Sequence, residues 1–304
     1  MLIGAGGLLT LLLLRHNLIP DAGGLGVLLD SAAPWLGLGV PVLALIALAR
    51  RSRLGIAAAV VPLLAWGYAF GWWWGGPDSK EPGQLIVVTQ NMSAANDAPG
   101  RAIRELRATG ADLIALQEVS GQNAHAADDE LSDDYPHHAA VGTVALWSRY
   151  PVSDVEPADV GAGWRRGLRA RVDVPGGALT VYVVHLPSIR LGDTATRDHG
   201  LATLSRELST EVSARVVVLG DFNTTATDRY WYDFAPGYHD SRRAAGGPQF
   251  TWPAAFPVVG PDHILVRGLR AATSSVLHTS GSDHRGLAAS LAVRDQPNPR
   301  RIGR

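Results

Sequence analysis

The stretch Arg215-Val216-Val217-Val218-Leu219-Gly220-Asp221-Phe222-Asn223 decides the fold class and points to the chemistry. An apolar, β-branched run that ends at a glycine predicts a buried strand. Asp221 and Asn223 follow this strand, and their side chains share one face because side chains alternate along a strand. Ligands of α/β sheets bind at the carboxyl ends of strands. A carboxylate beside a carboxamide orients a water molecule and stabilises negative charge, although Gly-Asp-x-Asn also suits a tight turn.

Four other polar positions border apolar runs in the same way. They are Asn91 after residues 85–90, Glu118 after 112–117, His185 after 181–184, and the pair Asp283 and His284 before the strand-like stretch 286–293. Each alone is compatible with a capped strand or a solvated loop. A structural protein has no reason to end strand after strand on such residues, so together they favour a catalytic centre.

The motifs that contain these residues resemble a known family. They are Gln90-Asn91-Met92, Leu116-Gln117-Glu118-Val119, Trp147-Ser148-Arg149-Tyr150-Pro151-Val152, Val184-His185-Leu186, Gly220-Asp221-Phe222-Asn223, Pro261-Asp262-His263-Ile264-Leu265 and Ser282-Asp283-His284. Their order is similar to that of the endonuclease/exonuclease/phosphatase superfamily, which includes DNase I-like nucleases, apurinic endonucleases, neutral sphingomyelinases and inositol polyphosphate 5-phosphatases. The resemblance covers about residues 84–294 and implies an α/β fold, a four-layer α/β sandwich of two mixed β-sheets flanked by helices.

The resemblance also implies a metal site. Glu118 resembles the principal carboxylate ligand of a divalent cation, with Asn91 and Asp283 as neighbouring ligands. Oxygen donors of this kind suit Mg²⁺ or Mn²⁺. Apurinic endonucleases carry an acidic residue two positions after the first Asn, whereas this chain has Ser93, which puts a second metal on that side in doubt.

The resemblance implies catalytic roles for five further residues. Asp221 corresponds to the residue that positions or deprotonates the attacking water, and Asn223 to its hydrogen-bonding neighbour. His284, oriented by Asp262, corresponds to a donor to a non-bridging phosphate oxygen, and His185 to a second donor. An in-line attack on phosphorus is accelerated mainly by positioning of the reactants and by neutralisation of the negative charge.

Three arginines offer charge to a substrate. Arg165, Arg166 and Arg190 are candidate contacts for a second phosphate or a nucleic-acid backbone, although solvated surface arginines are the commoner case. His263, His199 and His278 are expected to have structural or surface roles.

The N-terminal residues 1–74 predict a membrane segment of two to three transmembrane helices. Residues 54–74 carry no charge and end in three tryptophans, which suit a membrane interface. Residues 32–49 form a second expected span and 2–19 a shorter third one. A signal peptide is the competing interpretation of the first stretch, but no basic region precedes it and further spans follow.

Loop charges predict the orientation. Arg50, Arg51 and Arg53 lie between the two longer spans, so the positive-inside rule places this loop in the cytoplasm. Everything after Trp74 is then expected outside, in a multi-pass protein of the cell (plasma) membrane.

The remaining chain is expected to contain a linker, one catalytic domain and a tail. Residues 75–83 form the linker, 84–294 the domain and 295–304 a disordered basic tail. Helices are expected near 99–109 and 194–213, a hairpin over 168–186, and a solvated loop over the acidic stretch 128–134.

Composition is compatible with this organisation. The chain has 304 residues, no cysteine and a formal net charge of −1. The absence of cysteine excludes a disulfide framework, and the net charge disfavours tight nucleic-acid binding.

The sequence therefore predicts a membrane-anchored, divalent-metal-dependent phosphoester hydrolase that acts outside the cytoplasm. Its partners are the lipid bilayer and a phosphoester substrate, lipid-linked or small. Two alternatives are an extracytoplasmic DNA or RNA nuclease and a catalytically inactive, membrane-tethered binding domain. No protein partner is inferred.

Overall fold

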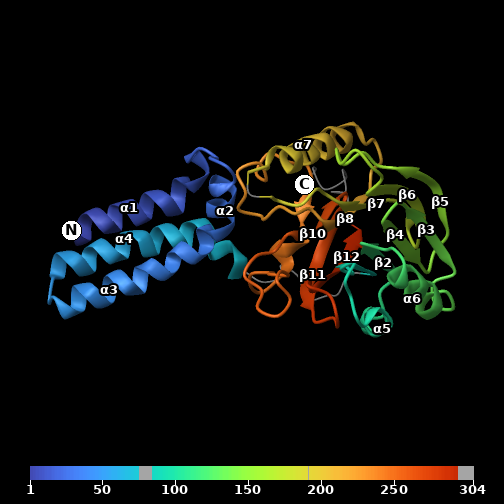
Figure 1. Cartoon of the computed structure of the whole chain (residues 1–304), viewed down its shortest axis with the longest axis horizontal. Coiled ribbons are helices and arrows are strands. Elements are labelled where there is room, and N and C mark those ends of the chain that lie inside the picture. The colour runs from blue at the N-terminus through green and yellow to red at the C-terminus, as the bar shows by residue number, and fades with distance from the viewer. Residues whose placement is uncertain (75–83, 191, 294–304) are drawn as a thin grey trace, which may run out of the picture.

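A computed structural model of the protein describes residues 1–74, 84–190 and 192–293. Within these residues, an N-terminal helical bundle projects from an α/β domain (Figure 1). The predicted linker 75–83 and the predicted tail 295–304 lie outside the described residues.

The first sheet has six strands in the order β11-β12-β1-β2-β4-β3. β1 and β2 are parallel, and the other neighbours are antiparallel. The strands are β1 (Leu85–Asn91), β2 (Leu113–Gln117), β3 (His137–Val141), β4 (Val144–Ser148), β11 (Leu269–Leu277) and β12 (Gly286–Val293).

The second sheet repeats this arrangement with the order β5-β6-β7-β8-β10-β9. Its parallel pair is β7 and β8. The strands are β5 (Val152–Pro157), β6 (Gly167–Val174), β7 (Gly177–His185), β8 (Val216–Asp221), β9 (His239–Asp240) and β10 (Asp262–Arg267). The predicted hairpin over 168–186 is confirmed as β6 and β7.

Apolar side chains from both sheets meet in one central core. Val87 and Leu113 from the first sheet and Val181, Leu219 and Ile264 from the second are fully buried in it. Such strands alternate their side chains, so each sheet also needs a cover on its outer face. Helices supply it, and the four-layer sandwich predicted from the sequence is confirmed.

Helices α5 (Pro99–Arg107) and α6 (Gln122–Leu131) cover the first sheet, and α7 (Ala195–Thr210) covers the second. The prediction of a solvated loop over 128–134 is wrong, because α6 extends through its first half. Ala127 and Leu131 are buried against the first sheet, while Asp128 and Asp129 face solvent. The acidic run is therefore the outer face of an amphipathic helix.

The N-terminal bundle contains helices α1 (Leu2–Arg15), α2 (Leu25–Ala32), α3 (Gly39–Ala49) and α4 (Arg53–Phe70). Short 3₁₀ segments cover His16–Leu18, Ala33–Leu38, Gly71–Trp74 and, in the α/β domain, Ser241–Ala244. α1 packs tightly along α4, because a Cβ atom on Gly6 would lie only 2.4 Å from the carbonyl oxygen of Ala58. Small residues allow this kind of close approach between membrane helices.

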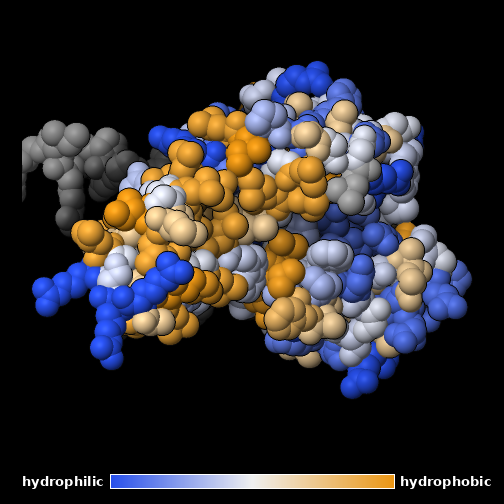
Figure 2. All heavy atoms as spheres, turned by 60° about the vertical axis from the view of Figure 1, so that its left-hand side comes forward, coloured by the Kyte–Doolittle hydropathy of each residue, from blue (hydrophilic) through white to orange (hydrophobic). Residues whose placement is uncertain are grey.

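Two helical stretches are long and apolar enough to cross a membrane, Leu25–Ala49 and Arg53–Trp74. The spans expected at 32–49 and 54–74 fall within them, while Leu2–Leu18 is shorter. In the view of Figure 2, hydrophobic residues cover most of the visible surface of the bundle. Exposed side chains such as Leu45, Leu48 and Leu64 belong to this surface.

Candidate active site

The polar residues singled out from the sequence gather at one edge of the sandwich. Asn91 and Asp221 end the strands β1 and β8, and they come from different sheets. The two sheets face each other, so the parallel pairs bring their carboxyl ends to the same cleft. Of the eight predicted catalytic and metal residues, seven are joined here by hydrogen bonds or by short charge–charge distances: Asn91, Glu118, His185, Asp221, Asn223, Asp262 and His284.

Asn91 bridges the two sheets. Its Nδ2 donates to Oε1 of Glu118 at 3.1 Å and to Oδ2 of Asp221 at 3.0 Å. Its Oδ1 accepts from the backbone nitrogen of Ser93 at 2.9 Å. In this orientation Asn91 presents its NH₂ group to the carboxylates, so a role as metal ligand requires the amide to rotate.

Glu118 presents its carboxylate to the cleft mouth. Its backbone takes a left-handed conformation, with φ of 57°, which directs the side chain away from the strand path. Oε2 accepts from the backbone nitrogen of Ala94 at 2.7 Å. The side chain remains 30% exposed, so it is anchored yet accessible to a ligand.

Asp221 is held by hydrogen bonds although it is only 1% exposed. Besides Asn91, the backbone nitrogen of Asn223 donates to Oδ1 at 2.8 Å, and Nδ2 of Asn223 donates to Oδ2 at 3.3 Å. Gly220 allows this turn, because its φ is 148° and a Cβ atom there would lie 1.9 Å from the carbonyl oxygen of Val184. Burial raises the pKa of Asp221 above its usual range, against the opposing effect of His284.

His284 and Asp262 form a hydrogen-bonded pair. Nδ1 of His284 lies 2.9 Å from Oδ2 of Asp262, and Nε2 lies 3.8 Å from Oδ2 of Asp221. Burial alone would lower the pKa of His284, but the negative charges of Asp262 and Asp221 raise it to about 10. His284 is therefore an imidazolium at neutral pH, and its Nε2–H points toward the cleft.

His185 differs from His284 in charge. Burial, reinforced by the positive charge of Arg166, lowers the pKa of His185 to about 2, so this ring is neutral. Its Nε2 accepts a hydrogen bond from Nη2 of Arg166 and lies 3.6 Å from Oδ2 of Asp221. Because a guanidinium only donates, the proton of the ring sits on Nδ1. The predicted donor His185 therefore presents an acceptor nitrogen here, and Arg166 carries the positive charge on this side of Asp221.

The other predicted site residues lie at the margin of the cleft. Asp283 is exposed, and its negative charge acts on His284. Arg190 is exposed. Burial lowers the pKa of Arg166, and the positive charge of Arg190 adds to this effect. Arg165 is exposed as well. Of the three candidate arginines, Arg166 alone contacts a predicted catalytic side chain in the described part of the chain.

Two further residues support the site in roles that the sequence did not assign. The hydroxyl of Thr251 donates to Oδ2 of Asp262, and the hydroxyl of Ser282 donates to the carbonyl oxygen of Asn91. Both are buried. Thr251 lies in a loop that no motif marks, and only the packing of that loop beside β10 places it here. His263, as expected, is structural, since it binds Asp240 and the backbone of Thr224.

The charges of the cleft favour a bound cation. Among the residues joined in the cleft, three carboxylates, on Glu118, Asp221 and Asp262, outnumber two cations, on Arg166 and His284. The formal charge of this group is therefore negative, which attracts a cation. Ligand atoms of Asp221, Asp262 and His284 all lie within 4.8 Å of one another. A protonated imidazole has no lone pair for a metal, so the accessible carboxylate of Glu118 is the better ligand.

Comparisons with known proteins agree with this arrangement. The uncharacterised protein YbhP of Escherichia coli strain K12 is 28% identical over 253 residues, which cover 71% of this chain and 99% of that protein. Two solved structures share the fold at a TM-score of 0.59, each covering 69% of this chain and 99% of its own: an endonuclease/exonuclease/phosphatase from Bacteroides vulgatus, 17% identical, and a humanized TDP2 of D. rerio, 16% identical.

A sequence model described as the Endonuclease/Exonuclease/phosphatase family matches residues 88–284 of this chain. The matched segment runs from β1 to His284 and thus includes both sheets and the cleft. Because this match spans more than half of its length, the chain belongs to the Endonuclease/Exonuclease/phosphatase family, whose members are typically metal-dependent phosphoester hydrolases.

Proposed function

We propose that the protein is a membrane-anchored, divalent-metal-dependent phosphoester hydrolase whose active site lies outside the cytoplasm. The observation that carries the chemistry is the gathering of three groups with different properties in one cleft. Asp221 is a buried carboxylate with a raised pKa, His284 is a buried cation, and Glu118 is an anchored, accessible carboxylate. A binding module has no need for such paired tuning, which is typical of catalytic sites.

The residues of the cleft suit an in-line attack of water on phosphorus. Asp221 orients the water and takes its proton, because a carboxylate with a raised pKa is a better base. The bond from water oxygen to phosphorus forms while the bond from phosphorus to the departing oxygen breaks, and that oxygen takes up a proton from solvent. His284 and Arg166 donate to the phosphate oxygens as negative charge accumulates on them.

Glu118 is the residue that would hold the metal, with Asp283 and a rotated Asn91 beside it. The ion, Mg²⁺ or Mn²⁺, would neutralise charge on the phosphate and the departing oxygen. A ligand set made only of oxygen atoms favours Mg²⁺ or Mn²⁺ over zinc, which prefers nitrogen and sulfur ligands.

The metal requirement gives a first prediction. Hydrolysis of bis-p-nitrophenyl phosphate by the full chain should require Mg²⁺ or Mn²⁺ and stop in EDTA. Glu118→Gln should lower turnover by about a hundredfold or more, because it removes a charged ligand. Glu156→Gln, on the exposed strand β5, is the matched control and should keep full activity. Undiminished turnover in metal-free buffer would contradict the assignment.

The roles of Asp221 and His284 give a second prediction. Asp221→Asn and His284→Ala should each lower turnover by about a hundredfold or more while the circular dichroism spectrum is unchanged. His278→Ala, an exposed histidine six residues before His284, should behave as the wild type. Equal losses in the His278 and His284 variants would show that the C-terminal motif has been assigned to the wrong residues.

The active-site edge of the domain is also the edge that contacts the bundle. The backbone nitrogen of Gly192 donates to Gly23 at 3.0 Å, in the loop that follows β7. Nε1 of Trp35 donates to the carbonyl oxygen of Val258 at 2.8 Å, in the loop before β10. These loops border His185 and Asp262. If the bundle lies in a bilayer, the cleft therefore faces the lipid surface.

The arginines of the α3–α4 turn support the orientation. Arg50, Arg51 and Arg53 lie at the end of the bundle far from the α/β domain, since α4 runs from this turn toward the domain (Figure 1). With these charges held in the cytoplasm, the α/β domain lies on the opposite side.

Orientation gives a third prediction, which uses the absence of cysteine from the chain. Val212→Cys places a thiol at a position that is 94% exposed on the α/β domain. A membrane-impermeant maleimide should label it in intact spheroplasts. Arg51→Cys, in the α3–α4 turn, should be labelled only after lysis. The reverse pattern would place the catalytic domain in the cytoplasm.

A cleft near the bilayer favours a lipid-linked or small phosphoester over DNA. The formal net charge of −1 gives no electrostatic support for tight nucleic-acid binding. An extracytoplasmic nuclease is the second candidate, and the cationic pair Arg166 and Arg190 at the cleft is the observation in its favour.

Substrate gives a fourth prediction. Full-length protein in lipid nanodiscs with Mg²⁺ should release phosphorylated head groups from phospholipid, or phosphate from small esters, faster than it cleaves RNA or nicks plasmid DNA. The Asp221→Asn variant is the blank for contaminating activity. Efficient nicking without turnover of lipid or small esters would make the protein a nuclease. Inactivity on every substrate would support the inactive binding domain.

A further inference from the structure

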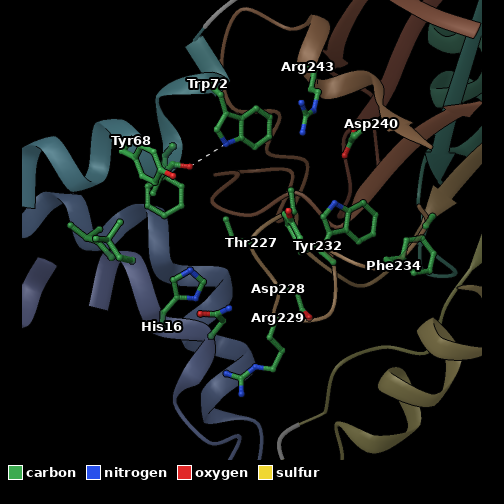
Figure 3. Close-up of a pocket in the computed structure, with 18 of the residues that line it drawn as sticks. His16, Tyr68, Trp72, Thr227, Asp228, Arg229, Tyr232, Phe234, Asp240 and Arg243 are labelled. Carbon is green, nitrogen blue, oxygen red and sulfur yellow. Dashed lines mark hydrogen bonds between the residues drawn. The ribbon is translucent and has the colours of Figure 1, made fainter. Parts of the chain in front are cut away.

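A cavity of about 630 Å³ lies between the helical bundle and the α/β domain, apart from the catalytic cleft (Figure 3). None of the predicted catalytic or metal residues lines it. In Figure 3, Tyr68 and Trp72 of the bundle face Tyr232 and Arg243 of the domain across this space. The cavity is therefore a feature of the junction, and hydrolysis at Asp221 does not account for it.

The lining has an apolar and a polar half. Leu14 and Tyr68 contribute exposed hydrophobic surface from α1 and α4. Thr227 and Arg243 contribute polar atoms from the domain. Such a division matches an amphipathic molecule, whose two ends need different surroundings.

The charges of the lining leave a cation available. The two lining carboxylates are neutralised by other residues, Asp228 by Arg197 at 2.7 Å and Asp240 by Arg242 at 3.7 Å. Arg243 has no ion pair with any described residue, and its guanidinium carbon lies 5.6 Å above the ring of Trp72.

A second cation, Arg15, lines the same cavity. Arg15 is exposed in the last turn of α1, and the hydrogen bond found for it among the described residues goes to the carbonyl oxygen of Leu14. Two other basic residues of the lining, His16 of the bundle and Arg229 of the domain, both bind Asp30. The cavity thus offers positive charge without a carboxylate to balance it.

The location identifies the source of a complementary anion. Arg15 ends α1, and Trp72 follows the end of α4, so both mark the level at which the apolar bundle stops. Arginine and tryptophan side chains sit at this level in membrane proteins, beside the phosphates of the lipid head groups. A soluble phosphate would use the arginines but not the apolar surface of Leu14 and Tyr68.

We propose that this junction cavity binds the head group of an anionic phospholipid from the leaflet on the domain side. The phosphate contacts Arg243, Arg15 adds positive charge to the same cavity, and the first carbons of the acyl chains lie against Leu14 and Tyr68. The bound lipid contacts both the bundle and the domain and thereby fixes their relative orientation. This proposal rests on the membrane placement given above but not on the chemistry of the cleft, so each can fail alone.

The test is native mass spectrometry of the full chain in detergent micelles with equal amounts of palmitoyl-oleoyl phosphatidylglycerol and phosphatidylcholine. The wild type should retain one phosphatidylglycerol in preference to phosphatidylcholine. Arg243→Gln should lower the affinity for phosphatidylglycerol about tenfold, as expected for one lost charge-assisted contact. Arg243→Lys, which keeps the charge, should retain most of the binding.

Arg101→Gln is the matched control, because Arg101 is an exposed arginine on α5, away from the junction. It should bind phosphatidylglycerol as the wild type does. Equal retention of the two lipids, or equal binding by the Arg243→Gln and Arg101→Gln variants, would overturn the proposal. Displacement of the lipid by an equal concentration of glycerol 3-phosphate would also overturn it, since the site would then be one for soluble anions.

Discussion

The buried carboxylate of Asp221 is the constraint on which the active-site edge depends. A charge that is only 1% exposed requires donors, and no single strand supplies enough of them. Asn91 comes from the first sheet, Asn223 from the turn after β8, and His284 from the segment before β12. The same bonds that make burial of Asp221 tolerable therefore hold the two sheets at the relative position that forms the cleft.

The two histidines show how position sets their charges. His284 lies against Asp262 and near Asp221, so it carries a proton well above neutral pH. His185 is equally buried but lies against Arg166, so it stays neutral. The pair therefore cannot exchange roles, although the two side chains are chemically identical. Neighbouring charges, rather than the residue type, assign a cation to one side of Asp221 and a neutral ring to the other.

The bundle and the domain are coupled by geometry as well as by chain connection. Asp30 of α2 binds Arg229 at 2.7 Å, and Asp21 binds Thr194 at 2.8 Å. These contacts fall on the loops at the catalytic edge, so the apolar helices and the cleft share one side of the domain. An exposed hydrophobic surface of this extent marks an interaction surface, and it lies on the same side of the domain as the cleft.

The sequence by itself determined the fold class, the two long apolar helices and the strand ends that bear Asn91, Glu118, His185 and Asp221, because these features depend on local periodicity and on motifs within a few residues. It did not determine the helix at 122–131, whose acidic outer face hides two buried contacts. Nor did it assign Thr251 to Asp262 or Arg166 to His185. Only the tertiary structure decided these pairings and the junction cavity, since each depends on how segments far apart in the chain pack, and on the charges that this packing brings together.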